Sequence, residues 1–328
     1  MPLIDGFDRL HDNLRISVTD RCNIRCFYCM PEGPILFLER EEILSFEEIE
    51  RVARVAVSLG VRKLRLTGGE PLVRKDLPVL VERLCAIPGV EDIGLTTNGV
   101  LLAGQAEALW RAGLRRLNVH LDTLDAERFF RITRRDDFGR VMEGLDRALE
   151  LGFRVKINAV AVTNLCEPDV VPLALYGRER GVEIRYIEFM PLDAQGLWDK
   201  SKVLLQDQMM EILRREVGEL VEIPDRDPRA PATEYRFADG IGKVGFISSV
   251  SKPFCLNCNR LRLTSDGKLR YCLFAIEELD VKGLLRGGGT DLELAEVIRE
   301  AVRRKWLGHE IHSTQFVAPP RPMYSIGG

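Results

Sequence analysis

The feature that most constrains the fold of this chain is a regular alternation of short apolar runs and helix-like segments between residues 14 and 190. The apolar runs have the length of strands, and the segments between them repeat apolar residues at helical spacing. Ser45 and Glu48 form a capping-box pattern before the first helix, and Gly60 follows its last apolar residue. The predicted strands are residues 14–18, 63–66, 93–97, 117–121, 155–162 and 183–189, and the later helices are residues 76–87, 105–113, 138–151 and 168–180.

Six successive βα units predict a parallel sheet with right-handed crossovers, which is either doubly wound or a barrel. Motifs that could carry chemistry follow the ends of the first three strands, where barrel enzymes build their active sites. We therefore predict an α/β fold with a partial, six-unit βα barrel of the TIM type over residues 1–190. Residues 191–328 lose this rhythm, with helices near 206–216 and 291–304 and a hairpin region around 234–272. They are predicted to be a C-terminal region that covers the barrel mouth.

Three cysteines, Cys22, Cys26 and Cys29, follow the first predicted strand with the spacing C-x3-C-x2-C. Three thiolates suit a [4Fe-4S] cluster whose fourth iron has no protein ligand. An open iron can bind S-adenosylmethionine, and one electron passed to the sulfonium would yield a 5′-deoxyadenosyl radical. The alternative is a structural zinc site, which usually takes four ligands in pairs; the nearest histidine, His11, lies far upstream in no such spacing.

A second group consists of Cys255, Cys258 and Cys272, with the spacing C-x2-C-x13-C. A zinc site completed by His309 or His312 is one interpretation of this group. The other is a second [4Fe-4S] cluster, because both groups lack the same fourth ligand. Such a cluster would carry the three cysteines as ligands in the C-terminal region and could hold a substrate at its open iron.

Two further patterns accompany the cysteines. In the segment from Thr67 to Pro71, a glycine pair would let the backbone approach a ligand, and Glu70 could accept a hydrogen bond from an ammonium group. Basic residues also alternate with apolar ones on predicted strands, and two cations on one face of a core strand are costly unless an anion meets them. A polyphosphate inside the barrel would supply that anion, and an exposed strand face is the alternative. The basic set is Arg15, Lys63, Arg65, Lys156, Arg185, Arg260 and Arg262.

Composition narrows the class of protein. A net charge of −3 argues against a nucleic-acid binder with a basic surface. The start of the chain carries acidic residues and no long apolar run, so we expect neither a signal peptide nor a membrane span. Six of the eight cysteines fall in two tight groups, which indicates metal ligands in a reducing cytoplasm rather than disulfides. Cys85 and Cys166 are left over and are predicted to be ordinary buried thiols.

Together these motifs resemble the GTP 3′,8-cyclase family of molybdenum cofactor biosynthesis, which is part of the radical S-adenosylmethionine superfamily. The resemblance runs from Asn13 to the last residue and is most specific in the two cysteine groups, in residues 258–262 and in the terminal Ile-Gly-Gly. It implies a lyase with two [4Fe-4S] clusters that converts GTP to (8S)-3′,8-cyclo-7,8-dihydro-GTP. In that family the radical takes the ribose 3′ hydrogen, and C3′ then attacks C8 of the purine.

The resemblance also implies roles for residues at matching positions. Catalytic roles fall to the first cysteine group and to the tail, Gly327 and Gly328. Contacts to S-adenosylmethionine fall to Tyr28, Gly69, Glu70, His120 and Met190. Contacts to GTP fall to Arg15, Lys63, Arg65, Thr96, Lys156, Arg185, Arg260 and Arg262. One departure is His120, which stands where the family commonly has a serine.

Expected partners are GTP, a reductant for the clusters and the downstream enzyme, cyclic pyranopterin monophosphate synthase. We also consider a homodimer, and expect no nucleic acid or membrane partner. Two rival hypotheses are a radical enzyme that modifies peptides and a non-enzymatic zinc or iron–sulfur module. The arginines and the Gly-Gly end argue against the first rival, and the colour of anaerobically purified protein would test the second.

Overall fold

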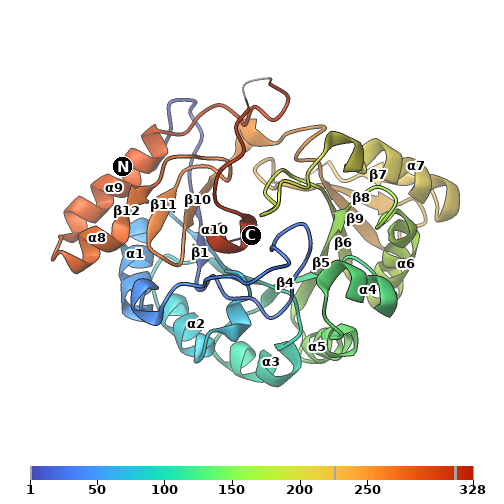
Figure 1. Cartoon of the computed structure of the whole chain (residues 1–328), viewed down its shortest axis with the longest axis horizontal. Coiled ribbons are helices and arrows are strands. Elements are labelled where there is room, and N and C mark those ends of the chain that lie inside the picture. Colours follow the sequence, from blue (N-terminus) through green and yellow to red (C-terminus); the bar gives the residue numbers. More distant parts are fainter. Residues whose placement is uncertain (1, 225–226, 314–315, 328) are drawn as a thin grey trace.

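The protein is built around one curved sheet. The computed structural model describes residues 2–224, 227–313 and 316–327. Within these ranges the strands form a 12-stranded sheet in the order β12-β11-β10-β1-β2-β3-β4-β5-β6-β9-β8-β7. Strands β10 to β9 in this order pair in parallel, and antiparallel strands extend both edges. Figure 1 shows the sheet curving into an open barrel with helices around its outside, as the sequence predicts.

The six predicted strands are present, each within one residue of the expected bounds. They are β1 Asn13–Ser17, β2 Lys63–Thr67, β3 Asp92–Thr97, β4 Arg116–His120, β5 Arg154–Ala161 and β6 Glu183–Glu188. The C-terminal strands are β7 Leu220–Glu222, β8 Thr233–Phe237, β9 Lys243–Ile247, β10 Arg260–Leu263, β11 Lys268–Arg270 and β12 Leu279–Asp280. The predicted hairpin region is therefore two hairpins, β8–β9 and β10–β11, at opposite edges of the parallel part of the sheet.

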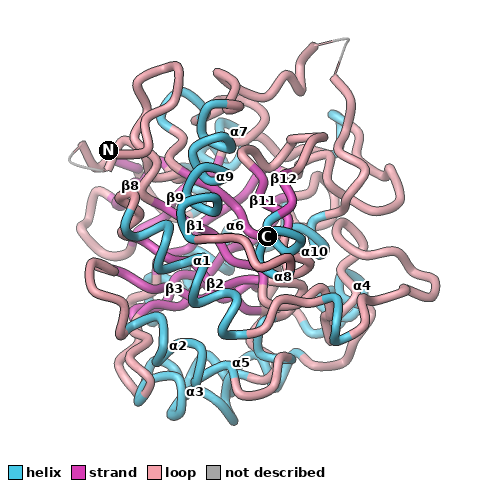
Figure 2. Tube along the Cα trace, turned by 90° about the vertical axis from the view of Figure 1, so that its left-hand side faces the viewer, coloured by secondary structure: helices cyan, strands magenta, loops and turns pink. Residues whose placement is uncertain are grey.

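Helices cover the outer face of the sheet, and Figure 2 shows the strands running inside them. The helices are α1 Phe46–Ser58, α2 Leu77–Cys85, α3 Leu102–Arg111, α4 Ala126–Thr133, α5 Phe138–Glu150, α6 Val170–Arg180, α7 Gln206–Glu216, α8 Val281–Arg286, α9 Asp291–Arg303 and α10 Met323–Ile326. The capping box is present at α1, where the Ser45 hydroxyl accepts from the Glu48 N–H and Glu48 accepts from the Ser45 N–H. Helix α4 is an element that the sequence analysis missed.

The prediction that the two cysteines outside the groups are buried is correct for one of them. Cys166 is buried in a small apolar cluster with Ile132, Phe189 and Val203. Cys85 is exposed, so the prediction of a buried thiol is wrong there. The buried positions of α2 are residues 77, 80, 81 and 84, and residue 85 therefore falls on the outer side of the helix. None of the described helices combines the length and the apolar character needed to cross a membrane.

Candidate active site

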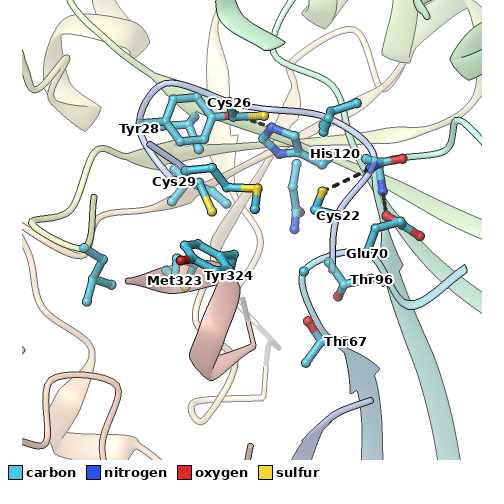
Figure 3. A pocket seen from close by; sticks show the side chains of 18 of the residues that line it. Cys22, Cys26, Tyr28, Cys29, Thr67, Glu70, Thr96, His120, Met323 and Tyr324 are labelled. Atoms are coloured by element: carbon cyan, nitrogen blue, oxygen red, sulfur yellow. Dashed lines mark hydrogen bonds between the residues drawn. The ribbon is translucent and has the colours of Figure 1, made fainter. Parts of the chain in front are cut away.

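A cavity opens at the C-terminal ends of β2 to β6, on the side where the loop after β1 carries the first cysteine group. Figure 3 shows Cys22, Cys26 and Cys29 pointing into it, with Tyr28 and His120 close by and Met323 and Tyr324 opposite. The predicted residues Thr96, Gly69, Glu70 and Met190 also line this cavity.

The cysteine loop packs directly on the segment that follows β2. Gly69 N–H donates to the carbonyl of Thr19 at 2.8 Å, and Glu70 N–H donates to that of Arg21 at 2.8 Å. A Cβ on Gly69 would lie 2.6 Å from the carbonyl oxygens of both Asp20 and Arg21. Gly69 is thus required for the close approach of two backbone segments, whatever ligand the cavity takes.

Glu70 is buried and organises the ends of two strands. Its carboxylate accepts from the Leu72 N–H at 2.9 Å, the Thr97 hydroxyl at 2.7 Å and the Asn98 N–H at 2.6 Å. Burial raises the pKa of Glu70 to about 7, although these hydrogen bonds oppose the rise. The carboxylate that was expected to meet an ammonium group therefore already holds the loop after β3, and its contact to S-adenosylmethionine stays a prediction.

His120 belongs to a buried polar cluster rather than standing alone. Its Nε2 lies 3.1 Å from Asp122 Oδ2 and is hydrogen-bonded to the Tyr28 hydroxyl, which itself donates to Asp122. Burial alone would lower the pKa of His120, but Asp122 and the neighbouring Cys26 hold it well above its usual value. His120 and Tyr28 thus form one hydrogen-bonded unit at the wall of the cavity.

The three cysteines fit an iron–sulfur cluster in their chemistry and placement. They are free thiols on one loop and face one cavity. Burial, Glu70 and Cys26 raise the pKa of Cys22 to about 12, and burial beside the other two thiols raises that of Cys29. Thiols crowded in this way need a cation to become thiolates, as cluster irons would provide. Among the described residues, no three His, Cys, Asp or Glu side chains are arranged to hold a single metal ion.

The second cysteine group lies at the opposite, N-terminal end of the parallel strands, just before β10, which pairs with β1. Cys255, Cys258 and Cys272 are free thiols, and burial, together with the nearby Cys272 and Cys258, raises the pKa of Cys255. Burial raises the pKa of Cys258, but Arg260 and Lys305 more than offset it and bring the value to about 6. A thiol with so low a pKa is suited to binding a metal or a cluster.

The two histidines of the zinc interpretation have other contacts. His312 Nε2 lies 2.6 Å from the Val250 carbonyl. The ring of His309 packs edge-on against Phe274, with centroids 5.0 Å apart. These contacts give His312 a role in holding the loop after β9.

Three of the predicted arginines lie side by side inside the barrel. Arg15 on β1 is in register with Arg65 on β2 and with Arg262 on β10. No carboxylate in the described residues forms an ion pair with any of the three. Burial lowers the pKa of Arg65 to about 10 and that of Arg262 to about 9, and burial beside Arg262 lowers that of Arg15. This layer of uncompensated positive charge has the electrostatics of an anion site.

Three of the remaining basic residues of the predicted set, unlike these arginines, form ion pairs with carboxylates of the chain. Lys156 Nζ lies 2.7 Å from Glu183, and Arg185 pairs with both Glu183 and Glu234. Lys63 pairs with Asp227 at 3.3 Å. For these residues the chain itself supplies the anion, so the expected charge cost does not require a ligand. Arg260 stacks on Phe254 and lies 3.5 Å from Cys258 Sγ.

The C-terminal tail enters the barrel. Figure 1 shows α10 within the opening of the arc. Gly327 has φ +83°, and a Cβ there would lie 2.8 Å from Ser17 Cβ and 3.0 Å from Thr67 Cγ2. Its carbonyl accepts from Arg262 at 2.6 Å, so glycine is the residue that fits this position. Gly328, the other predicted tail residue, lies outside the described residues.

Comparisons with known proteins agree with this arrangement. Residues 16–175 match the radical SAM superfamily, and residues 182–311 match the family described as Molybdenum Cofactor Synthesis C. A GTP 3′,8-cyclase from Rhodopirellula baltica is 48% identical over 99% of this chain and 92% of its own length. The chain belongs to the GTP 3′,8-cyclase family. A second member, from Pelotomaculum thermopropionicum, is 46% identical over 99% of both chains.

Solved structures show the same fold at low identity. Streptococcus suis SuiB bound to its precursor peptide SuiA superposes with a TM-score of 0.60 and 18% identity, covering 89% of this chain and 68% of that chain. The predicted family and the partial-barrel fold are thus confirmed. Membership of the radical SAM superfamily also confirms the expectation of S-adenosylmethionine and one [4Fe-4S] cluster.

Some residues of this family member escaped the sequence analysis. Asn98 lines the cavity and donates to Asn23 at 2.8 Å; its position at the end of a predicted strand was the available signal. Asp122 and Glu188 also follow or end strands, and Glu188 accepts from the backbone of Gln206, Val250 and Ser251. Lys305 had no signal, because no motif surrounds it.

Proposed function

We propose that this chain is a GTP 3′,8-cyclase that uses two [4Fe-4S] clusters. The observation that carries the proposal is the register of Arg15, Arg65 and Arg262 across three adjacent strands, without a carboxylate partner in the described residues. Three guanidinium groups in one buried or partly buried layer suit a triphosphate. They lie deeper in the barrel than the cavity of the first cysteine group, because the cavity is built from the later residues of the strands.

In this proposal the first cysteine group serves the cleavage of S-adenosylmethionine, and the second serves the binding of GTP. When bound, the first cluster supplies the electron that cleaves S-adenosylmethionine and gives the 5′-deoxyadenosyl radical. Tyr28, Met190 and His120 line the space for that cosubstrate, and Gly69 closes the loop beneath it. Cys255, Cys258 and Cys272 would hold a second cluster, which would supply a coordination site for the guanine, and the arginine layer would hold the phosphates.

The reaction then joins C3′ of the ribose to C8 of the purine. The radical removes the 3′ hydrogen and leaves as 5′-deoxyadenosine, and the new C3′–C8 bond places the unpaired electron on the purine. One electron from a reductant and one proton then complete the 7,8-dihydro product. A cyclic pyranopterin monophosphate synthase would consume this product, and the external reductant and a homodimer belong to the same proposal.

An anaerobic assay of reconstituted protein with S-adenosylmethionine, dithionite and GTP tests the proposal. We expect 5′-deoxyadenosine and the cyclised nucleotide to form together, both dependent on GTP. Formation of 5′-deoxyadenosine that ignores GTP would contradict the substrate assignment. No 5′-deoxyadenosine from fully iron-loaded protein would contradict the radical chemistry.

A further inference from the structure

Lys305 follows α9 and points into the second cysteine group. Its side chain is nearly buried, with the residue 6% exposed. The ammonium donates to the carbonyl of Arg260 at 2.9 Å and to that of Tyr271 at 2.8 Å, and it lies 3.7 Å from Cys258 Sγ. Arg260 follows Cys258 by two residues and Tyr271 directly precedes Cys272. One ammonium group therefore ties together the two segments that carry these cysteines.

The third cysteine is tied to the same place by Arg9. The Arg9 guanidinium donates to the carbonyl of Cys255 at 2.7 Å and to those of Trp306 and Leu307 at 2.7 and 2.9 Å. Asp5 accepts from Arg9 Nε at 2.7 Å and keeps the guanidinium in position. Residues 305–307 thus connect the turn that carries Cys255 and Cys258 with the separate segment that carries Cys272.

The charge of Lys305 also lacks a carboxylate partner. None of the ion pairs among the described residues includes it. Its hydrogen-bond partners among the described residues are two carbonyls and the sulfur of Cys258, so the positive charge faces the cysteine group. A buried cation is costly unless an anion compensates it. A [4Fe-4S] cluster with three thiolate ligands carries net negative charge and would supply that compensation.

We propose that Lys305 is a positioning residue and the buried countercharge of the second cluster. It holds the Cys258 and Cys272 segments at the spacing that the cluster needs, and its charge makes the cluster easier to reduce. The proposal rests on the second cluster of the proposed function.

The experiment isolates the second cluster in the full-length chain. The parent carries Cys22→Ala, Cys26→Ala and Cys29→Ala, so that iron bound after anaerobic reconstitution reports the other group. Lys305→Met removes charge and donors, and Lys305→Gln removes the charge but keeps an amide that can donate. Arg303→Met is the matched control, because Arg303 is the last residue of α9, two positions before Lys305, with a side chain that is 55% exposed and pairs with Glu296 and Glu300.

Iron and sulfide per chain and the reduction potential from an electron-paramagnetic-resonance titration are measured for each protein. The parent and Arg303→Met are expected to hold about four irons with one common potential. Lys305→Gln should keep most of the iron and shift the potential to more negative values, since a positive charge beside the cluster is lost. Lys305→Met should lose most of the iron.

The outcomes distinguish a failure of the proposed second cluster from a failure of the proposed role of Lys305. A parent that binds no iron overturns the second cluster and this proposal together. A parent with iron, combined with unchanged iron and potential in both Lys305 variants, overturns the role of Lys305 alone. If Lys305→Met does not fold, Lys305→Gln decides through the potential, which a purely structural role would leave unmoved.

Discussion

The two cysteine groups of this protein are built in opposite ways. The first lies on one loop, with Cys22, Cys26 and Cys29 within eight residues, and its walls come from the ends of neighbouring strands. The second is spread over residues 255–272 and is held by Arg9 and Lys305, which are far away in the sequence. A compact motif thus makes the first site, whereas long-range contacts make the second.

The electrostatic environments differ as well. Burial and neighbouring anions raise the pKa of Cys22 to about 12. At Cys258 burial acts in the same direction, but Arg260 and Lys305 bring the pKa to about 6. A cluster beside cations is stabilised in its more negative, reduced state. The comparison indicates that one polypeptide can give two similar cysteine groups opposite electrostatic environments by the charges it places around them.

The largest effect is expected at the first group. Replacing Cys26 by Ala removes one of three ligands and should abolish reductive cleavage of S-adenosylmethionine, measured as 5′-deoxyadenosine by chromatography. Cys85→Ala is the control, because this thiol is exposed at the end of α2 and should leave cleavage unchanged. Cleavage by the Cys26 variant at the wild-type rate would contradict the radical assignment.

Cys258→Ala should impair the second cysteine group and leave the first one functional. We expect loss of about four irons per chain and loss of GTP binding in equilibrium dialysis. The first cluster should still cleave S-adenosylmethionine slowly without GTP, because Cys22, Cys26 and Cys29 are untouched. Unchanged GTP affinity in this variant would show that the arginine layer alone binds the nucleotide.

Gly327→Ala probes the tail that lies between the two groups. The positive φ and the contact with Ser17 should cost about 1–3 kcal/mol in the docked tail. The tail is then expected to leave the barrel, so that product formation falls by at least about tenfold while both clusters stay loaded. Ser325→Ala, in the same helix, is the control. Wild-type product formation by Gly327→Ala would mean that tail docking does not matter for turnover.

The smallest effect concerns thiol reactivity in the metal-free protein. Above pH 6 Cys258 is mainly thiolate and should be alkylated by iodoacetamide, and its rate should fall as the pH drops through about 6. Cys22, with its pKa raised to about 12, should react at least about tenfold more slowly at pH 7. Peptide mass spectrometry gives both profiles. Equal rates for the two thiols would contradict the claim that the surrounding charges shift the pKa values of Cys258 and Cys22 in opposite directions.

The sequence predicted the longer helices, the strands and the local motifs, and it missed one short helix and the contacts between distant segments. Strands β1 to β6 followed from apolar runs between turn residues, and the first cysteine group from its spacing. Helix α4 was missed because it has eight residues, and only its Asp125 cap marks its start. Glu183 and Glu234 could not be foreseen as partners of Arg185, because Glu234 comes from β8, whose place in the sheet does not follow the order of the sequence. Lys305 was missed because no motif surrounds it and its partners, Arg260 and Tyr271, lie more than thirty residues away in the sequence.

The placement of the C-terminal strands has a consequence for how the chain folds. Strand β10 pairs with β1 and strand β9 pairs with β6, so the C-terminal region completes both edges of the N-terminal strands. A fragment that stops near residue 190 would leave two long backbone edges open to water and to other chains. Such a fragment is expected to self-associate, and the barrel should gain its full cooperativity only once the last third of the chain has been synthesised.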